Sequence, residues 1–138
     1  MVRGIIAGLT AGAILGALFK GVEAWTNHLV YVLLLNVDYI PGLRSWITQE
    51  WQQFSIHMML SVSVALSFAY GFHKRGITGR GRILYAVLFS LSLGALLYPT
   101  TLLSEVTPSF TDLGAFFWWM TGHALYGWVA GWILSMHK

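Results

Sequence analysis

Long apolar stretches alternate with short polar segments along this chain, and they predict four helices that cross a membrane. The stretches cover residues 4–25, 51–72, 83–103 and 113–136. A hydrocarbon core of about 30 Å takes about 20 helical residues to cross, and each stretch has about that length. Backbone polar groups cannot stay unpaired in lipid, so each stretch is expected to be a helix. The pattern predicts an all-α, polytopic membrane protein with a single domain over residues 1–138.

The composition strengthens this prediction. Hydrophobic residues make up 57% of the chain and charged residues only 9%, against about 25% charged residues in soluble domains. The lipid bilayer is therefore the first partner to expect. The chain has no cysteine, which excludes disulfides, thiolate metal sites and cysteine nucleophiles.

Glycine recurs at every fourth position of the first stretch. A helix face of this kind lets another helix approach closely inside a membrane. We expect it to pack against the last helix of the same chain, or against the first helix of a second copy in a homo-oligomer. The glycines assigned to helix packing are Gly4, Gly8, Gly12 and Gly16, with Gly127 and Gly131 at the same spacing in the last stretch.

The segment over residues 28–42 is harder to interpret. Its apolar run, Leu29–Leu35, is too short to cross a membrane. It could extend the first helix, or it could lie at the membrane surface or re-enter the membrane before the turn signal at Pro41 and Gly42. We favour an interfacial or re-entrant segment.

The placement of charge predicts the orientation. Residues 74–82 contain four basic residues and no acidic one, and short basic loops stay on the cytoplasmic side. Four crossings return both ends of the chain to that side, an N-in and C-in topology. The acidic residues then fall on or near the outer side, and the net charge of +3 needs no nucleic-acid partner. Tryptophan and tyrosine are expected at the outer interface, namely Trp25, Trp46, Trp51, Tyr98, Trp118 and Trp119.

Polar side chains within the predicted helices are the candidate binding residues, because a charge at mid-bilayer costs at least about 2.5–3.5 kcal/mol. Lys20 continues the glycine period, and Glu23 follows it at a spacing that allows an ion pair. The pair could be structural, with Lys20 extended toward the interface, or it could line an outward-facing cavity. The full candidate set is Lys20, Glu23, His57, Ser61, His123 and Tyr126.

The two histidines allow several interpretations. Each can be a hydrogen-bonded structural residue, or part of a site for anions or protons together with Lys20. A haem held between His57 and His123 is a third possibility, because bundle cores host cofactors and haem iron accepts histidine ligands. The depths expected for the two residues differ by about 10 Å, so no cofactor is expected, and neither is a metal site.

Sequence signatures of soluble enzymes are absent, including the P-loop, the nucleophile elbow and the zinc-protease motif, so we do not expect an enzyme. Binding or permeation of a small ion or solute at an outward-facing polar site is the first expectation. The alternatives are an accessory subunit that docks a larger membrane complex through its glycine face, and a haem-binding electron-transfer subunit.

The order of these residues resembles that of the YagU-type bacterial inner-membrane proteins. In that family, a glycine-rich first helix ends in lysine followed closely by glutamate, the second helix carries histidine with serine four residues later, and the last helix opens with Gly-His. The corresponding residues are Gly8 to Gly16 with Lys20 and Glu23, then His57 and Ser61, then Gly122 and His123.

The resemblance covers nearly the whole chain and implies a multi-pass protein of the bacterial cytoplasmic (inner) membrane, without implying an activity. Two features depart from the family. The spacing from Lys20 to Glu23 is three residues where the family has four, and the Pro-Pro-Arg that follows in the family is missing. The small YqhR-like membrane proteins have a similar four-span organisation.

Overall fold

The computed structural model describes residues 1–43 and 45–136, and these residues form an all-helical protein. All four stretches expected to be helical are helical, and a 3-10 helix continues the third of them. The elements are α1 (Val2–Thr26), α2 (Val30–Leu35), α3 (Glu50–Arg75), α4 (Arg80–Leu97), the 3-10 helix η1 (Tyr98–Leu103) and α5 (Leu113–Ser135).

Three of the helical segments are long and apolar enough to cross a membrane. They are α1, α3 and the continuous stretch of α4 and η1 over Arg80–Leu103. In the most apolar part of each segment, more than half of the residues are not buried inside the bundle. Apolar surface of this kind is what a helix presents to lipid. The chain is therefore a helical protein with the features of a membrane protein.

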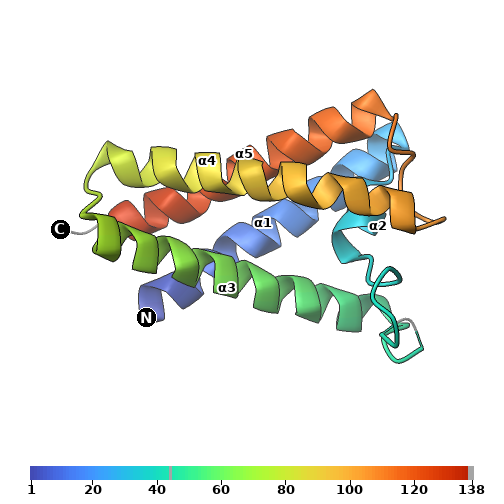
Figure 1. Ribbon diagram of the computed structural model, residues 1–138, viewed down its shortest axis with the longest axis horizontal. Coiled ribbons are helices and arrows are strands. Elements are labelled where there is room, and N and C mark those ends of the chain that lie inside the picture. The colour runs from blue at the N-terminus through green and yellow to red at the C-terminus, as the bar shows by residue number, and fades with distance from the viewer. Residues whose placement is uncertain (44, 137–138) are drawn as a thin grey trace.

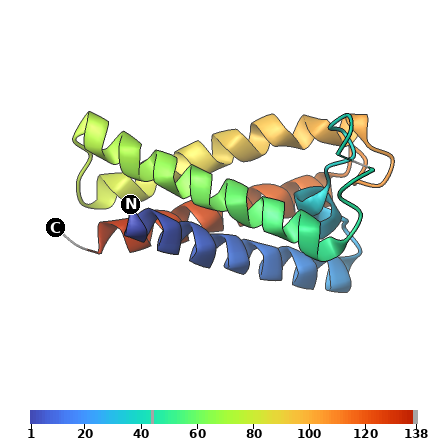
Figure 2. The same cartoon turned by 90° about the horizontal axis from the view of Figure 1, so that it is seen from below.

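The long helices lie side by side in the order α3, α1, α5, α4 (Figures 1 and 2). Although α3 and α4 follow one another in the chain, they make few contacts. They meet at the turn over residues 76–79 and diverge from there (Figure 2). We call this the hairpin end, and Figure 1 shows that α1 begins and α5 ends there. The opposite end, with α2 and the long loops, is called the α2 end.

The glycine face of α1 packs against α3 within the same chain. A β-carbon at Gly8 would lie 2.5 Å from the Cα atom of Val62, and one at Gly12 would lie 2.5 Å from the Oγ atom of Ser61. The expected partners, the last helix or a second copy, are thus wrong for this face. The reason is that α3 presents Ser61 and the backbone at Val62 opposite the glycines, which allows the closest approach.

The glycines of α5 pack against α4. A β-carbon at Gly127 would lie 2.7 Å from the Cα atom of Val87, and one at Gly131 would lie 2.9 Å from the Cα atom of Ile83. Together with the α1–α3 contact, this gives two pairs of closely packed helices. The pairs join where α1 meets α5.

The segment after α1 forms a cap over the α2 end. Helix α1 ends at Thr26 because Asn27 adopts a left-handed backbone conformation with φ of 60°, so the segment does not extend the first helix. Helix α2 is six residues long and buries Val30, Leu33 and Leu35 against the bundle. Its interfacial or re-entrant position in a membrane stays a prediction.

Two of the aromatic residues expected at the outer interface lie inside the bundle instead. Trp119 and Tyr98 are each 3% exposed. The indole N–H of Trp119 donates to the carbonyl of Gly94 at 2.9 Å, and the hydroxyl of Tyr98 donates to the carbonyl of Asp112 at 3.0 Å. Both polar groups have partners within the protein, so neither needs the membrane surface to satisfy them.

Candidate functional site

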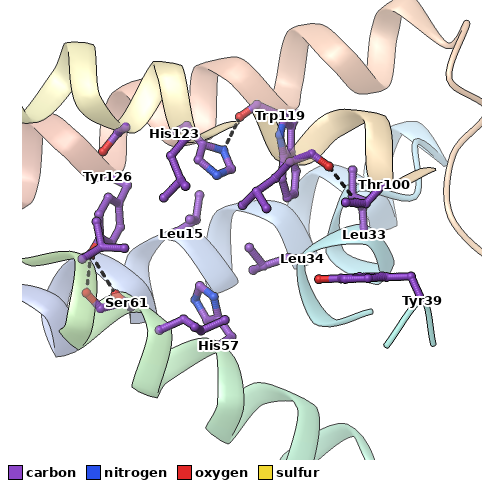
Figure 3. A pocket seen from close by; sticks show the side chains of 15 residues that line it. Leu15, Leu33, Leu34, Tyr39, His57, Ser61, Thr100, Trp119, His123 and Tyr126 are labelled. Carbon is purple, nitrogen blue, oxygen red and sulfur yellow. Dashed lines mark hydrogen bonds between the residues drawn. The ribbon is translucent and has the colours of Figure 1, made fainter. Parts of the chain in front are cut away.

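A cavity of about 140 Å³ lies between the four long helices and is covered by α2 (Figure 3). Leucine side chains form much of its wall. Tyr39, in the loop after α2, and Thr100 of η1 also line it. The polar residues that carry the argument below come from α3, α4 and α5, and they are His57, Ser61, Ser90, Trp119, His123 and Tyr126.

His57 presents one ring nitrogen to this cavity. The residue is buried in α3, and its Nε2 lies 3.0 Å from the carbonyl oxygen of Gly12 on α1. A carbonyl only accepts hydrogen bonds, so Nε2 carries the hydrogen. In the neutral ring Nδ1 is then an acceptor, and no residue in the described ranges bonds to it.

His123 presents a second ring nitrogen from the other side. Its Nδ1 donates to the carbonyl of Trp119 at 2.9 Å, which leaves Nε2 as the acceptor of the neutral ring. The ring fits because position 94 has no side chain: a β-carbon at Gly94 would lie 2.8 Å from the Cγ atom of His123. Figure 3 shows the rings of His57 and His123 facing the cavity from opposite walls.

Ser61 and Tyr126 use their hydroxyls within the protein. The Ser61 hydroxyl donates to the carbonyl of Gly8 at 2.7 Å, and the Tyr126 hydroxyl donates to the carbonyl of Ser61 at 2.6 Å. The two hydroxyl oxygens are 3.2 Å apart. These bonds tie α1, α3 and α5 together at the floor of the cavity.

Ser90 on α4 is a cavity residue that sequence reasoning missed. It is 1% exposed, and its hydroxyl has no hydrogen-bond partner among the residues that the structure describes. A buried hydroxyl without a partner costs about 1–3 kcal/mol. The overlooked signal is the row of small residues Ala86, Ser90 and Gly94, which are spaced by four and all buried.

The cavity does not continue toward the hairpin end. Phe68 is fully buried below it and meets the rings of Phe89 and Tyr126 edge-on, at centroid distances of 5.5 and 6.2 Å. This aromatic cluster closes the bundle beneath the histidines. The cavity is therefore a blind pocket and not a pore.

Lys20 and Glu23 lie outside the cavity, at the α2 end. The Nζ atom of Lys20 is 2.6 Å from Oε1 of Glu50 and 5.2 Å from the centre of the Tyr31 ring. The carboxylate of Glu23 accepts the backbone N–H groups of Tyr31 and Val32 at 2.8 and 3.0 Å. The expected ion pair between Lys20 and Glu23 is wrong, because the first turn of α2 offers Glu23 unpaired N–H donors.

A second polar cluster thus forms around Glu50. The Tyr31 hydroxyl donates to Oε1 of Glu50 at 2.9 Å. Burial, and then the hydrogen bond and charge of Glu50, raise the pKa of Tyr31 to about 12. This cluster links α1, α2 and α3, and the single site expected from the sequence is divided between it and the cavity.

The size of the cavity bears on the haem hypothesis. Apolar cavities of about 150 Å³ hold a molecule of the size of benzene. A cavity of about 140 Å³ has no room for a porphyrin between His57 and His123. The geometry of these histidines therefore does not fit that group.

Comparisons with protein-family models, curated proteins and solved structures give no match for this chain. The resemblance to the YagU-type proteins accordingly stays a prediction, and the chemistry of the cavity has to be argued from its own residues.

Proposed function

We propose that the protein binds a small uncharged molecule with hydrogen-bond donor groups in this cavity. The observation that carries the proposal is the pair of ring nitrogens, Nδ1 of His57 and Nε2 of His123, that face the cavity without a partner in the described chain. Small-molecule sites are typically apolar cavities with a few placed polar groups. Two acceptors favour a guest that donates.

The anion or proton expected from the sequence loses its main support. That expectation relied on Lys20, whose ammonium group pairs with Glu50 outside the cavity. Among the residues that the structure describes, no lysine or arginine lines the cavity to compensate an anion. A charge without a partner is expensive in such surroundings. The aromatic cluster of Phe68, Phe89 and Tyr126 closes the cavity toward the hairpin end, which favours binding over permeation.

We further propose that α5 is a fourth membrane span. It has 23 residues, which is about 35 Å of helix, and it carries no charged residue. It runs beside α1 and α4 through the whole bundle (Figure 1). It is not among the three segments named above, and it is rich in tryptophan, glycine, histidine and tyrosine residues, several of which are buried inside the bundle.

The distribution of charge supports an orientation with the hairpin end in the cytoplasm. The basic residues Lys74, Arg75, Arg80 and Arg82 gather at that end together with Arg3. All five acidic residues lie at or near the α2 end, in the order Glu23, Asp38, Glu50, Glu105 and Asp112. Positive charge is retained on the cytoplasmic side. A bacterial cytoplasmic membrane is the proposed location.

The binding function can be tested with phenol as the probe. We would label the histidines with ¹⁵N in detergent-solubilised protein and follow their side-chain signals. Saturable shifts of the His57 and His123 signals are expected because their unshared nitrogens accept the phenol hydroxyl. His28 and His73 lie outside the cavity lining and serve as internal references. If the His57 and His123 signals do not shift at saturating phenol, the proposal is refuted.

Two controls sharpen this test. Lys20→Met should leave phenol binding unchanged, because Lys20 lies outside the cavity. Sodium chloride in place of phenol should shift neither cavity histidine. A chloride-dependent shift that disappears in Lys20→Met would restore the anion site expected from the sequence.

The alternative of an accessory subunit has no specific observation to support it. The glycine face that was expected to dock a larger complex is covered by α3. A homo-oligomer remains a proposal and would use another surface. Native mass spectrometry from mild detergent distinguishes the two: integer multiples of 15.4 kDa indicate self-association, and a co-purifying foreign chain indicates a larger complex.

A further inference from the structure

The cavity has an apolar mouth between α3 and α4. Its exposed rim residues are Leu60 on α3, which is 61% exposed, and Leu97 on α4, which is 37% exposed. Both helices are long and apolar enough to cross a membrane. Leu60 lies about 15 Å along α3 from Glu50 at 1.5 Å per residue, so the mouth reaches deep into the hydrocarbon region.

This mouth exists because α3 and α4 separate from each other. They touch little beyond the turn at the hairpin end, and each packs closely on a different helix. Figure 2 shows the two ribbons diverging toward the α2 end. At that end, Leu33 and Leu34 of α2 and Tyr39 of the following loop line the cavity and cover it. A ligand can therefore enter the cavity from the side, between α3 and α4, whereas entry from the α2 end is covered.

The interior of the cavity fits one six-membered ring. Its volume of about 140 Å³ is close to that of a cavity that holds benzene. Trp119 contributes an aromatic wall, and its ring lies 4.4 Å from that of His123. A larger fused-ring molecule would not fit beside them.

The polar atoms are placed for a ring with donors on opposite edges. Acceptors face the cavity from the α3 wall at His57 and from the α5 wall at His123 (Figure 3). Ser90 of α4 also lines the cavity, and its buried hydroxyl has no partner among the described residues. A hydroquinone has two hydroxyl donors at opposite positions of one ring. It is uncharged at neutral pH, because phenolic pKa values are about 10.

From these features we infer that the cavity takes the hydroquinone headgroup of a lipid-soluble molecule whose apolar tail leaves between α3 and α4. The inference rests on the proposed small-molecule function and names its ligand class. The ring lies against Trp119, its hydroxyls donate to His57 and His123, and its tail passes Leu60 and Leu97 into lipid. A fatty acid fits poorly, because no lysine or arginine within residues 1–43 and 45–136 lines the cavity to receive its carboxylate.

The test uses protein in lipid nanodiscs and decylhydroquinone, kept reduced under anaerobic conditions. Decylbenzene has the same tail without the hydroxyls, and hydroquinone has the same ring without the tail. Decylhydroquinone is expected to shift the ¹⁵N signals of His57 and His123 saturably and to bind at least tenfold tighter than hydroquinone. Decylbenzene is expected to shift neither signal.

Two pairs of variants locate the site. Ser90→Ala should weaken decylhydroquinone binding by about two- to tenfold, the value of one neutral hydrogen bond, and Ser92→Ala on the exposed face of α4 should leave it unchanged. Leu60→Trp should slow binding by obstructing the mouth. Met59→Trp, at an exposed neighbouring position outside the cavity lining, should not.

The outcomes separate this inference from the proposed function. Equal binding of hydroquinone and decylhydroquinone, with no effect of Leu60→Trp, overturns the tail and the lateral route while a small-molecule site remains. Histidine shifts with decylbenzene overturn recognition by hydrogen bonds. If phenol, hydroquinone and decylhydroquinone all leave the histidine signals unmoved, the proposed function itself fails.

Discussion

The glycines of α1 do more than allow close packing. Because α3 approaches so closely, the side chains of Ser61 and His57 reach the backbone carbonyls of Gly8 and Gly12 at 2.7 and 3.0 Å. Those bonds set the orientation of the His57 ring. The orientation in turn leaves Nδ1 for the cavity. The glycine face thus determines the chemistry of the site through the distance between two helices.

A matched pair of glycine substitutions tests this close approach. Gly8→Ala places a β-carbon 2.5 Å from the Cα atom of Val62, so the helices must separate, and a loss of about 1–3 kcal/mol in the free energy of unfolding is expected. Gly21→Ala meets nothing within 4 Å and should gain up to about 1 kcal/mol from helix propensity. Unfolding in mixed detergent measures both. Equal effects would mean that α3 does not pack against Gly8.

At the residue scale, the sequence identified His57 and His123 because they are polar residues in apolar helices. It also placed Lys20 on the glycine face, which packs on α3, and Lys20 does continue that row, because its Nζ atom lies 2.6 Å from Oε1 of Glu50, the first residue of α3. One turn earlier, Gly16 meets Phe54 of the same helix. The sequence could not show that this end of the row lies outside the cavity. Ser90 was missed because its signal, the row of small residues Ala86, Ser90 and Gly94, is weak beside the exposed Ser92 of the same helix.

At the element scale, Asp112 starts α5 and connects it to the end of α1. Its Oδ1 accepts the backbone N–H of Ala115 at 3.0 Å, and its Oδ2 lies 3.0 Å from Nδ1 of His28. Burial acts to raise the pKa of Asp112, but the bonds from Ala115 and His28 outweigh it and hold that pKa below its ordinary value. The ionised carboxylate therefore stabilises the folded protein.

This carboxylate predicts a loss of stability in acid. A group whose pKa is lowered by folding contributes fully above its unfolded pKa, near 3.8 for Asp112, and the contribution disappears as the pH falls through the lower folded-state value. Asp112→Asn keeps an acceptor for the helix cap but cannot titrate. When the pH is lowered from about 6 to about 3, the unfolding midpoint of the Asp112→Asn variant should fall less than that of the natural protein. Parallel curves for the two proteins would contradict the assignment.

The long helices were predictable because their apolar runs are long and are bounded by polar residues. Their partners were not predictable. Which helix receives the glycine face depends on the small residue Ser61 and the exposed backbone at Val62, and any of the other helices also offers small residues. Helix α2 was ambiguous because the run Leu29–Leu35 is short. Its position depends on the bundle end that it covers and on the bonds from Glu23.

At the scale of the whole molecule, the proposed orientation can be tested with cysteine labelling, because the chain has no cysteine of its own. Single variants Thr78→Cys, Ser109→Cys and Met136→Cys place a thiol at the hairpin end, at the α2 end and just after α5. In intact bacterial cells, an impermeant maleimide should label only position 109. Labelling of position 136 together with 109 would show that α5 does not cross, and labelling of 78 and 136 without 109 would reverse the orientation.

The shared cavity was beyond the reach of the sequence for a geometric reason. Counting residues from the helix ends places His57 and His123 at depths that differ by about 10 Å, yet both line one cavity. Residue counting assumes upright helices, whereas α3 and α5, which carry the two histidines, are inclined to each other (Figure 1). Helix tilt and rotation follow from packing against neighbours and are not contained in the length of an apolar run.

The order of the helices in space has a consequence for biosynthesis. Helices α1 and α3 emerge from the ribosome early and can pair at once, but α4 has few contacts with α3 and packs mainly on α5. Since α5 is synthesised after α4, α4 stays in the membrane without its main partner until α5 has followed it. Trp119 and His123 arrive with α5 as well. The binding cavity therefore forms only once α5 is present, and a nascent chain that stops before α5 cannot hold a ligand there.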